Sequence, residues 1–450
     1  MVRVTDMTHG RPIRLILLFS LPLMLGSVFQ QLYTIVDTII IGRGVGMQAL
    51  ASIGAADWIN WLVLWGLQGF TQGFAILAAQ EFGAGAYDRL RRVLAMIVKL
   101  SCWFGIAVTI ISLLLVRPLL TLLHTDPAVF DGAQTYLYVQ FGGSLIIIAY
   151  NMAAAVLRCL GDSRTPLFAI IAASFANIAL DLLFVMGFGW GIFGASFATV
   201  LAQLIAFLLC LRSLRRLPFV QLTKADWKTD PAILLHLCRL GIPTGLQMSM
   251  ITLGGMVLQS VLNGFGVVFV AGYTAANKLY GILESASVAF GYAMTAYMGQ
   301  NRGARNAARI DAGIRAVLAL SAGFTAAIVT AMLLAGKPLL GLFLSTEEAG
   351  AADALAVAYQ YLMVLMAFLF ALFMLQAYRS SLQGLGEMTV PTLSGFAEML
   401  MRMGAALVLP TFIGQSGVFF AEGAAWVCAA ALNLVWYYMR IGKIKREMLQ

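Results

Sequence analysis

The chain has 450 residues, of which 61% are hydrophobic and only 11% are charged. In an ordinary soluble domain about a quarter of the residues are charged. This composition therefore excludes that class and is typical of a protein with many membrane spans. The formal net charge of +9 could indicate a nucleic-acid partner, but the positions of the basic residues, described below, argue against one. The five cysteines are scattered and show no metal-binding spacing.

Long apolar segments follow one another along the whole chain. Runs of about 20 mainly apolar residues are long enough to cross a bilayer, and a chain without closed β-barrels spans it as helices. The twelve predicted segments are 13–41, 48–79, 90–116, 127–157, 164–188, 192–216, 231–263, 268–299, 305–335, 349–382, 388–412 and 416–440. The sequence therefore predicts an all-α integral membrane protein with twelve transmembrane helices.

Lysine and arginine are distributed unequally between the two sets of connections. If the N-terminus is cytoplasmic, 22 of them lie on the inner side, and only Arg43, Arg117 and Lys337 lie on the outer side. Because positive residues accumulate on the cytoplasmic side of membrane proteins, both termini are predicted to be cytoplasmic. We expect a multi-pass protein of the plasma (cell inner) membrane, with the bilayer and no nucleic acid as its partner.

The two halves of the chain resemble each other. The longest inner connection, about 212–239, separates six segments from six. Matching features are Pro22 with Pro243, Gln80 with Gln300, Gly161 with Gly386, and Pro166 with Pro391. An even number of helices in each half gives a parallel repeat, which predicts two pseudo-symmetric six-helix lobes around a central cleft. The predicted organisation is an N-lobe at 1–216, a cytoplasmic inter-lobe loop at 217–230 and a C-lobe at 231–450.

Carboxylates occur inside the apolar segments of the first half. Asp37 lies among Ile, Val and Thr residues, about 6 Å below the outer end of its helix, and Asp181 about 10 Å below the same face. Asn177 shares a helix face with Asp181, and Thr199 and Tyr136 reach a similar depth. No basic residue stands nearby in sequence, so a proton or a small cation is the expected partner of these carboxylates. A polar patch that only holds helices together remains the alternative.

These features together resemble the multidrug and toxin extrusion (MATE) family over essentially the whole chain. The resemblance rests on Pro22, Gln31-Leu32-Tyr33 with Asp37, the Gln80 turn, the two Leu-Gly-Asp/Glu turns, and Asn177 with Asp181. It is strongest to the prokaryotic branch that couples through N-lobe carboxylates. The sodium-coupled branch with carboxylates in helices 7 and 10 matches less well, because segment 231–263 contains no Asp or Glu and helix 10 carries Arg379.

The resemblance implies roles for individual residues. It implies an ion-coupling site, with H⁺ or Na⁺ as the coupling ion and no other cofactor; the site residues are Tyr33, Asp37, Tyr136, Asn151, Asn177, Asp181 and Thr199. Among them, Asn151 lies deeper than the rest, and a Na⁺ ion would use Asp37, Asn177, Asp181 and Thr199. Pro22 removes a backbone hydrogen bond from helix 1 and is predicted to be a hinge that responds to Asp37, with a static bend as the alternative.

The second half also holds charged residues within its helices. Glu398 and Arg402 are four residues apart and are predicted to form an ion pair. The alternative is that Glu284 or Glu398 faces the cavity and attracts cationic substrates. Candidate substrate-cavity residues are Gln30, Glu284, Arg379 and Glu398.

The absence of a G-x4-G-K-[S/T] motif removes ATP as the energy source, and no catalytic constellation indicates an enzyme. The sequence thus predicts a monomeric antiporter that exports small amphipathic, often cationic organic compounds in exchange for H⁺ or Na⁺. A flippase for a lipid or lipid-linked sugar, of the same superfamily, is the first alternative. A receptor or channel and a membrane enzyme are more distant alternatives.

Overall fold

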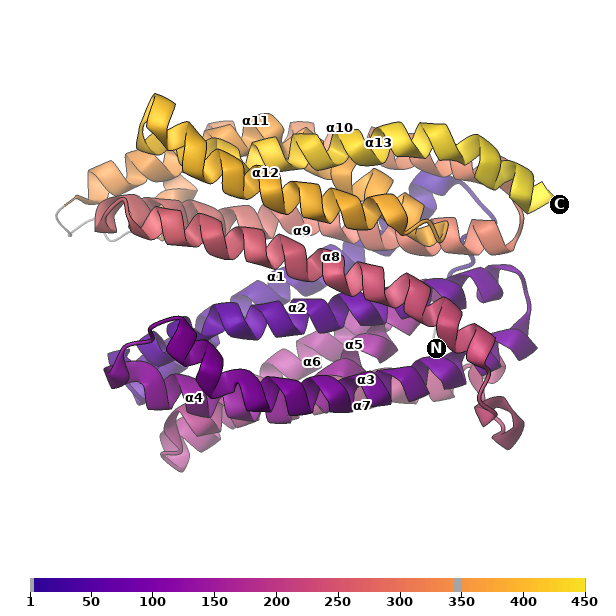
Figure 1. The fold of residues 1–450 in the computed structure, drawn as a ribbon, viewed down its shortest axis with the longest axis horizontal. Coiled ribbons are helices and arrows are strands. Elements are labelled where there is room, and N and C mark those ends of the chain that lie inside the picture. The colour runs from indigo at the N-terminus through magenta and orange to yellow at the C-terminus, as the bar shows by residue number, and fades with distance from the viewer. Residues whose placement is uncertain (1–3, 344–349, 450) are drawn as a thin grey trace. The chain divides into compact units, whose positions relative to one another are not determined.

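The structure, a computed structural model, describes residues 4–343 and 350–449. Within these ranges the regular structure comprises thirteen α-helices and short 3-10 or π segments, without strands (Figure 1). The predicted all-α class is confirmed. The ends of the two predicted lobes, at residues 1 and 450, and the first residue of the predicted segment 349–382 lie outside the described residues.

The twelve predicted segments each coincide with one helix or with a broken helix. In the first half the helices are α1 (Pro12–Gly44), α2 (Met47–Gly83), α3 (Tyr87–Leu122), α4 (Pro127–Gly142), α5 (Ser144–Cys159), α6 (Arg164–Asp181) and α7 (Gly191–Arg215). In the second half they are α8 (Pro231–Asn263), α9 (Val267–Gly303), α10 (Ala307–Gly341), α11 (Ala351–Gly384), α12 (Thr389–Ile413) and α13 (Phe420–Leu449).

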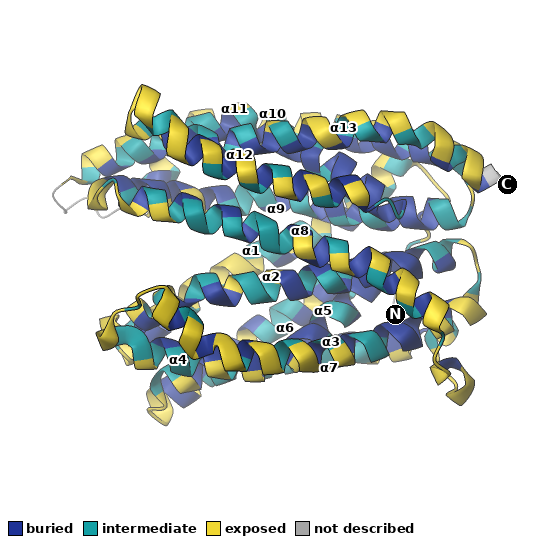
Figure 2. Ribbon diagram, in the orientation of Figure 1, coloured by how far each residue is buried: buried dark blue, intermediate teal, exposed yellow. Residues whose placement is uncertain are grey.

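Most of these helices qualify as membrane spans. Among the described residues, ten are long and apolar enough to cross a bilayer, and the bent pair α4–α5 would make eleven. The helix α9 does not qualify by composition; it contains Lys278, Glu284 and several Gly, Ser and Tyr residues, which lower its hydropathy. Large apolar side chains are exposed along the helices, such as Leu114 of α3 at 72% (Figure 2). Such apolar exposure suits lipid, and the chain is a multi-pass membrane protein.

Two predicted helices are interrupted. The segment predicted at 127–157 bends by 50° between α4 and α5, at Gly143. A side chain at Gly143 would come within 2.5 Å of Val200, so glycine allows α7 to pack closely at the bend. The segment predicted at 164–188 changes after Asp181 into a π-helical stretch, η1 (Leu182–Gly187). Widened π turns occur frequently at functional sites, and this one directly follows a buried carboxylate.

The chain divides into two compact units. Unit 1 contains Leu21–Gly245 with the residues up to Asp6, and unit 2 contains Met7–Ser20 and Leu246–Gln450. The first turns of α1 therefore belong to unit 2, and the first turns of α8 belong to unit 1. Pro22 and Pro243 lie close to the two points at which these helices pass from one unit to the other. The lobe boundaries inferred from the sequence, 1–216, 217–230 and 231–450, stay a prediction.

The connection between α7 and α8 is held against α3 in unit 1. It contains two 3-10 turns, η2 (Pro218–Val220) and η3 (Lys224–Trp227). Lys99 of α3 donates to the Trp227 carbonyl oxygen at 2.6 Å, which explains a lysine inside an apolar segment. Burial alone would raise the pKa of Asp226, but hydrogen bonds from Thr223 and the nearby Arg91 hold that pKa below its usual value.

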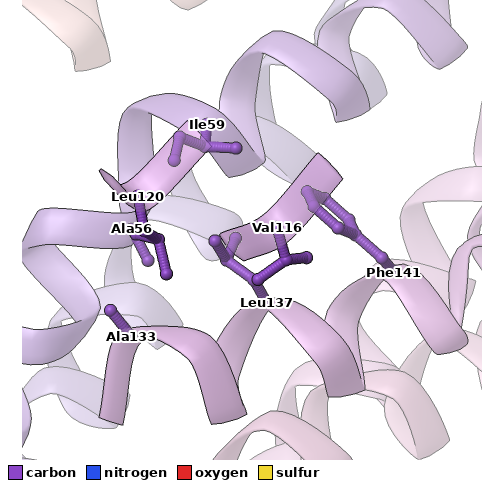
Figure 3. Close-up of a cluster of buried hydrophobic side chains, with 7 residues drawn as sticks. All are labelled: Ala56, Ile59, Val116, Leu120, Ala133, Leu137 and Phe141. Carbon is purple, nitrogen blue, oxygen red and sulfur yellow. The ribbon is translucent and has the colours of Figure 1, made fainter. Parts of the chain in front are cut away.

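A buried apolar cluster in unit 1 joins α2, α3 and α4 (Figure 3). Its members are Ala56, Ile59, Val116, Leu120, Ala133, Leu137 and Phe141. Their side chains point toward one another. The partly buried Tyr136 packs against the cluster. This packing fixes the register of α2 against α4 and so determines which polar residues of the two helices meet.

Close helix packing in unit 1 depends on Gly73. A Cβ atom at Gly73 would lie 2.5 Å from the Cα of Gly241 and 2.6 Å from the Leu240 carbonyl oxygen, both backbone atoms of α8. At Gly54 of the same helix, nothing lies within 4 Å. We expect Gly73→Ala to reduce the yield of monodisperse protein in size-exclusion chromatography, because two backbones would have to separate. Gly54→Ala is the matched control and should be neutral or slightly stabilising; equal yields of the two variants would contradict the prediction.

Candidate functional site

Two carboxyl groups face each other in unit 1. Asp37 lies on α1 and Asp181 is the last residue of α6, with no exposed surface. They are close enough to share a hydrogen bond when one of them is protonated. Both carboxyl oxygens of Asp181 and the Oδ1 atom of Asp37 are buried without a hydrogen-bond donor. Two such acceptors repel each other when both are charged, so the pair requires a proton or a cation.

Tyrosine side chains from two helices surround Asp37. Tyr33 lies one turn before it on α1, and Tyr136 of α4 lies within electrostatic range of it. Asn60 of α2 donates to the Tyr136 hydroxyl oxygen at 3.2 Å. The polar group thus draws side chains from α1, α2, α4 and α6, each held by the packing of its own helix.

A third carboxylate, Asp57 of α2, belongs to the same region and was missed from the sequence. It lies within electrostatic range of both Asp37 and Tyr136. A signal was present, because Asp57 and Asn60 share a helix face and lie about nine and twelve residues inside the predicted segment 48–79. At 1.5 Å per residue this is about 14 to 18 Å of depth, comparable with Tyr136.

The other predicted ion-coupling residues differ in their contacts. Asn177 is 1% exposed, one turn before Asp181, and neither its amide oxygen nor its amide nitrogen has a partner. Thr199 donates to the Ala195 carbonyl oxygen at 3.2 Å, and Asn151 to that of Ile147 at 2.9 Å, each within its own helix. The structure therefore brings Tyr33, Asp37, Tyr136 and Asp181 together with a free amide beside them, and ties Thr199 and Asn151 to backbone instead.

In the part of the chain that the structure describes, these carboxylates form no ion pair with a positively charged side chain. Among the ion pairs of residues 4–343 and 350–449, none involves Asp37, Asp57 or Asp181. Within the same ranges, no three His, Cys, Asp or Glu side chains are grouped as for a metal ion. A proton, or a cation that also uses amide and hydroxyl oxygens, fits this chemistry.

The helix that carries Asp37 also carries the predicted hinge. The helix α1 continues without a break through Pro22, which lies four turns before Asp37. Pro22 leaves the carbonyl oxygen one turn earlier without its usual donor, so this point bends most easily. Gln30, a predicted cavity residue on the same helix, is exposed.

In unit 2 the predicted pair of Glu398 with Arg402 is confirmed, at 3.1 Å. Glu398 also binds Arg379 at 2.5 Å, and Arg402 binds Glu422 at 2.8 Å. Both arginines and Glu398 are at least nine-tenths buried. Glu284 forms no ion pair among the described residues but interacts with the Tyr280 hydroxyl and lies in electrostatic range of Glu422. The substrate-cavity role of these residues stays a prediction.

Two repeated sets of membrane helices with buried polar clusters define a membrane transporter built from an internal repeat. The MatE family model matches the chain twice, at residues 22–183 and 243–408, once in each half. The chain belongs to the MatE family, the multidrug and toxin extrusion transporters. These are membrane transport proteins for small molecules.

The relatives extend over the whole chain. It is 32% identical to "Probable multidrug resistance protein YpnP" of Bacillus subtilis, covering 100% of this chain and 99% of the relative. Identity to the probable multidrug resistance protein NorM of Thermotoga maritima is 24%, covering 93% and 90%. Among solved structures, "Crystal structure of MATE in complex with MaL6" matches with a TM-score of 0.91 at 24% identity, covering 99% and 100%. MATE structures described as bent and straight conformations both match with a TM-score of 0.89.

Proposed function

We propose that this protein is a secondary antiporter that exports amphipathic, often cationic organic compounds in exchange for inward movement of H⁺ or Na⁺. The observation that carries the proposal is the Asp37–Asp181 pair, which is buried, lacks a donor and lacks a counter-charge. The names of the relatives as multidrug resistance proteins support the substrate class. We place both termini in the cytoplasm, on the basis of the basic inner connections, and the protein acts as a monomer.

Occupancy by the ion changes the electrostatics between α1 and α6. With one proton shared, the two carboxyl groups form a hydrogen bond that holds the helices together. Without it, two like charges repel in a medium of low dielectric constant, and one carboxylate must turn toward water or another partner. A Na⁺ ion would bind both carboxylates and the Asn177 amide oxygen. Ion binding therefore favours one packing of α1, which is the property that a coupled transporter needs.

The test is transport in proteoliposomes with pH and Na⁺ gradients imposed separately. The probe is a fluorescent organic cation trapped on the side that corresponds to the cytoplasm. We expect one of the two gradients to drive its export, and an ionophore that dissipates that gradient to stop it. Export that is independent of both gradients would contradict antiport. Gradient-independent movement of a labelled lipid in the same vesicles would favour the flippase alternative.

The hinge in α1 gives a second test of the mechanism. Pro22→Ala restores the missing backbone hydrogen bond and stiffens the helix, so we expect substrate binding to be retained but export to be slower. Spectroscopic distances between labels on α1 and α6 should change less between acidic and alkaline pH than in the parent. Pro338→Ala, at an exposed proline inside α10, is the matched control. If Pro22→Ala shows the parental pH-dependent change, Pro22 is a static bend.

A further inference from the structure

The internal repeat allows the two polar clusters to be compared residue by residue. Pro166 aligns with Pro391 and Gly161 with Gly386, an offset of 225 residues. The two matches to the family model end at residues 183 and 408, which gives the same offset. In this register α6 begins opposite the start of α12, and Asn177 falls opposite Arg402. The corresponding counterparts in the other helices are Tyr361 for Tyr136 and, from the Gln80–Gln300 match, Tyr280 for Asn60.

Unit 2 therefore has a polar cluster that includes corresponding positions, with a guanidinium group where unit 1 has a neutral amide, although its glutamates stand at other positions than the aspartates of unit 1. Arg402 is 5% exposed, and its nitrogen atoms donate to Glu398, Glu422 and the Ile251 carbonyl oxygen. That last distance is 3.0 Å. Arg402 is thus held from α8, α12 and α13, and it is a fixed part of the cluster.

The two clusters also differ in charge balance. Unit 1 brings together Asp37, Asp57 and Asp181, and no ion pair of the described residues neutralises any of them. Unit 2 brings together Glu284, Glu398 and Glu422 with two buried arginines, Arg379 and Arg402. The helix α8, which corresponds to α1, contains no Asp or Glu at all. The positive charge that unit 1 lacks is built into unit 2.

We propose that Arg402 is a built-in cation which occupies, in unit 2, the role that the exchangeable ion has in unit 1. The inference rests on the proposed ion coupling in unit 1. It adds that only the unit 1 half of the repeat exchanges an ion. Arg402 keeps both Glu398 and Glu422 permanently paired with a fixed positive charge, so one coupling-ion site operates per molecule. Removal of the guanidinium leaves Glu422 without its ion-pair partner, whereas Glu398 keeps Arg379, and so opens a second site in which Glu422 takes up a proton or Na⁺.

The test measures thermal unfolding of Arg402→Gln in detergent, in a background that carries Asp37→Asn and Asp181→Asn. This background removes the unit 1 carboxyl pair, so a change in ion dependence must come from elsewhere. The groups around the vacated position are Arg379 and Tyr361 of α11, Glu284, Tyr273 and Tyr280 of α9, Glu398 of α12 and Glu422 of α13. The tyrosines stay neutral across the range used, so the glutamates govern the response.

We expect the Tm of the Arg402→Gln variant to be about 5 °C higher at about pH 5.5, or with about 150 mM Na⁺, than at about pH 8 with choline. The background protein should show a much smaller difference. A Tm that is lowered equally under every condition would show that Arg402 only supports packing, and would overturn the proposal.

A second variant covers the case in which Arg402→Gln does not fold. Adding Glu422→Gln removes the carboxylate that loses its ion-pair partner with Arg402, so the double variant should recover its Tm and lose the dependence on acid or Na⁺. A double variant that is no more stable than the single one would contradict the built-in cation. The proposed ion coupling in unit 1 is tested separately, in the Asp37→Asn, Asp181→Asn variant that keeps Arg402. Ion-driven transport by that variant would contradict ion coupling in unit 1.

Discussion

Asp181→Asn and Asp37→Asn are each expected to reduce ion-driven efflux to the background level while the protein remains folded. Asparagine has the size of aspartate but neither ionises nor takes up the coupling proton. It also brings an amide donor into a place where the oxygen atoms of Asp181 have none. The free energy of unfolding should therefore stay equal to that of the parent or rise, because an unpartnered buried carboxylate gains a hydrogen bond. Efflux in proteoliposomes and Tm measured on the same preparations check both parts.

Two further variants make this prediction specific. Asp131→Asn, at an exposed residue of α4, is the matched control and should leave transport unchanged. Asp57→Asn should slow transport without abolishing it, because Asp57 interacts with Asp37 and is not a partner of Asp181. Full drug resistance in cells that express the double Asp37→Asn, Asp181→Asn variant would remove the coupling role from this pair.

The helices were predictable because each needs a long apolar run, and such runs are visible in the sequence without knowledge of their neighbours. The interruptions within these helices could not be predicted in the same way. The bend at Gly143 depends on how closely Val200 of α7 approaches, and the π turn after Asp181 depends on local packing. The passage of α1 and α8 between two units likewise depends on contacts far apart in sequence.

The candidate site shows the same limit. Depth along each helix predicted Asp37, Asn177, Asp181, Thr199 and Tyr136 in one layer, and the same calculation applies to Asp57, which was overlooked. Depth could not predict the hydrogen bond of Thr199, because a threonine in a helix can satisfy its hydroxyl group on the carbonyl oxygen one turn earlier. In unit 2 the spacing of Glu398 and Arg402 along one helix predicted their contact. The ion pairs with Arg379 and Glu422 could not be predicted from spacing, because these two residues lie on other helices.

The second large effect is expected at Glu398, where we predict that Glu398→Gln lowers the free energy of unfolding by about 3 to 5 kcal/mol, the usual cost of removing one partner of a buried ion pair. Glu398 is the only carboxylate in an ion pair with Arg379 among the described residues, and both side chains are about 4% exposed. After the substitution, the Arg379 guanidinium has no carboxylate partner among the described residues, although its contact of 3.5 Å to the Ser394 hydroxyl remains. A charge without a counter-charge in a medium of low dielectric constant is costly.

The matched control is Glu422→Gln, because Glu422 is also paired with an arginine but leaves Arg402 bound to Glu398. Its side chain is 17% exposed, so we expect a smaller loss of stability. Chemical unfolding of both variants in the same detergent measures the difference, and adding Arg379→Gln to Glu398→Gln should restore part of the stability by removing the stranded charge. If Glu398→Gln is as stable as the parent but exports cationic compounds selectively less well, then Glu398 contributes to substrate recognition rather than to the ion-paired core.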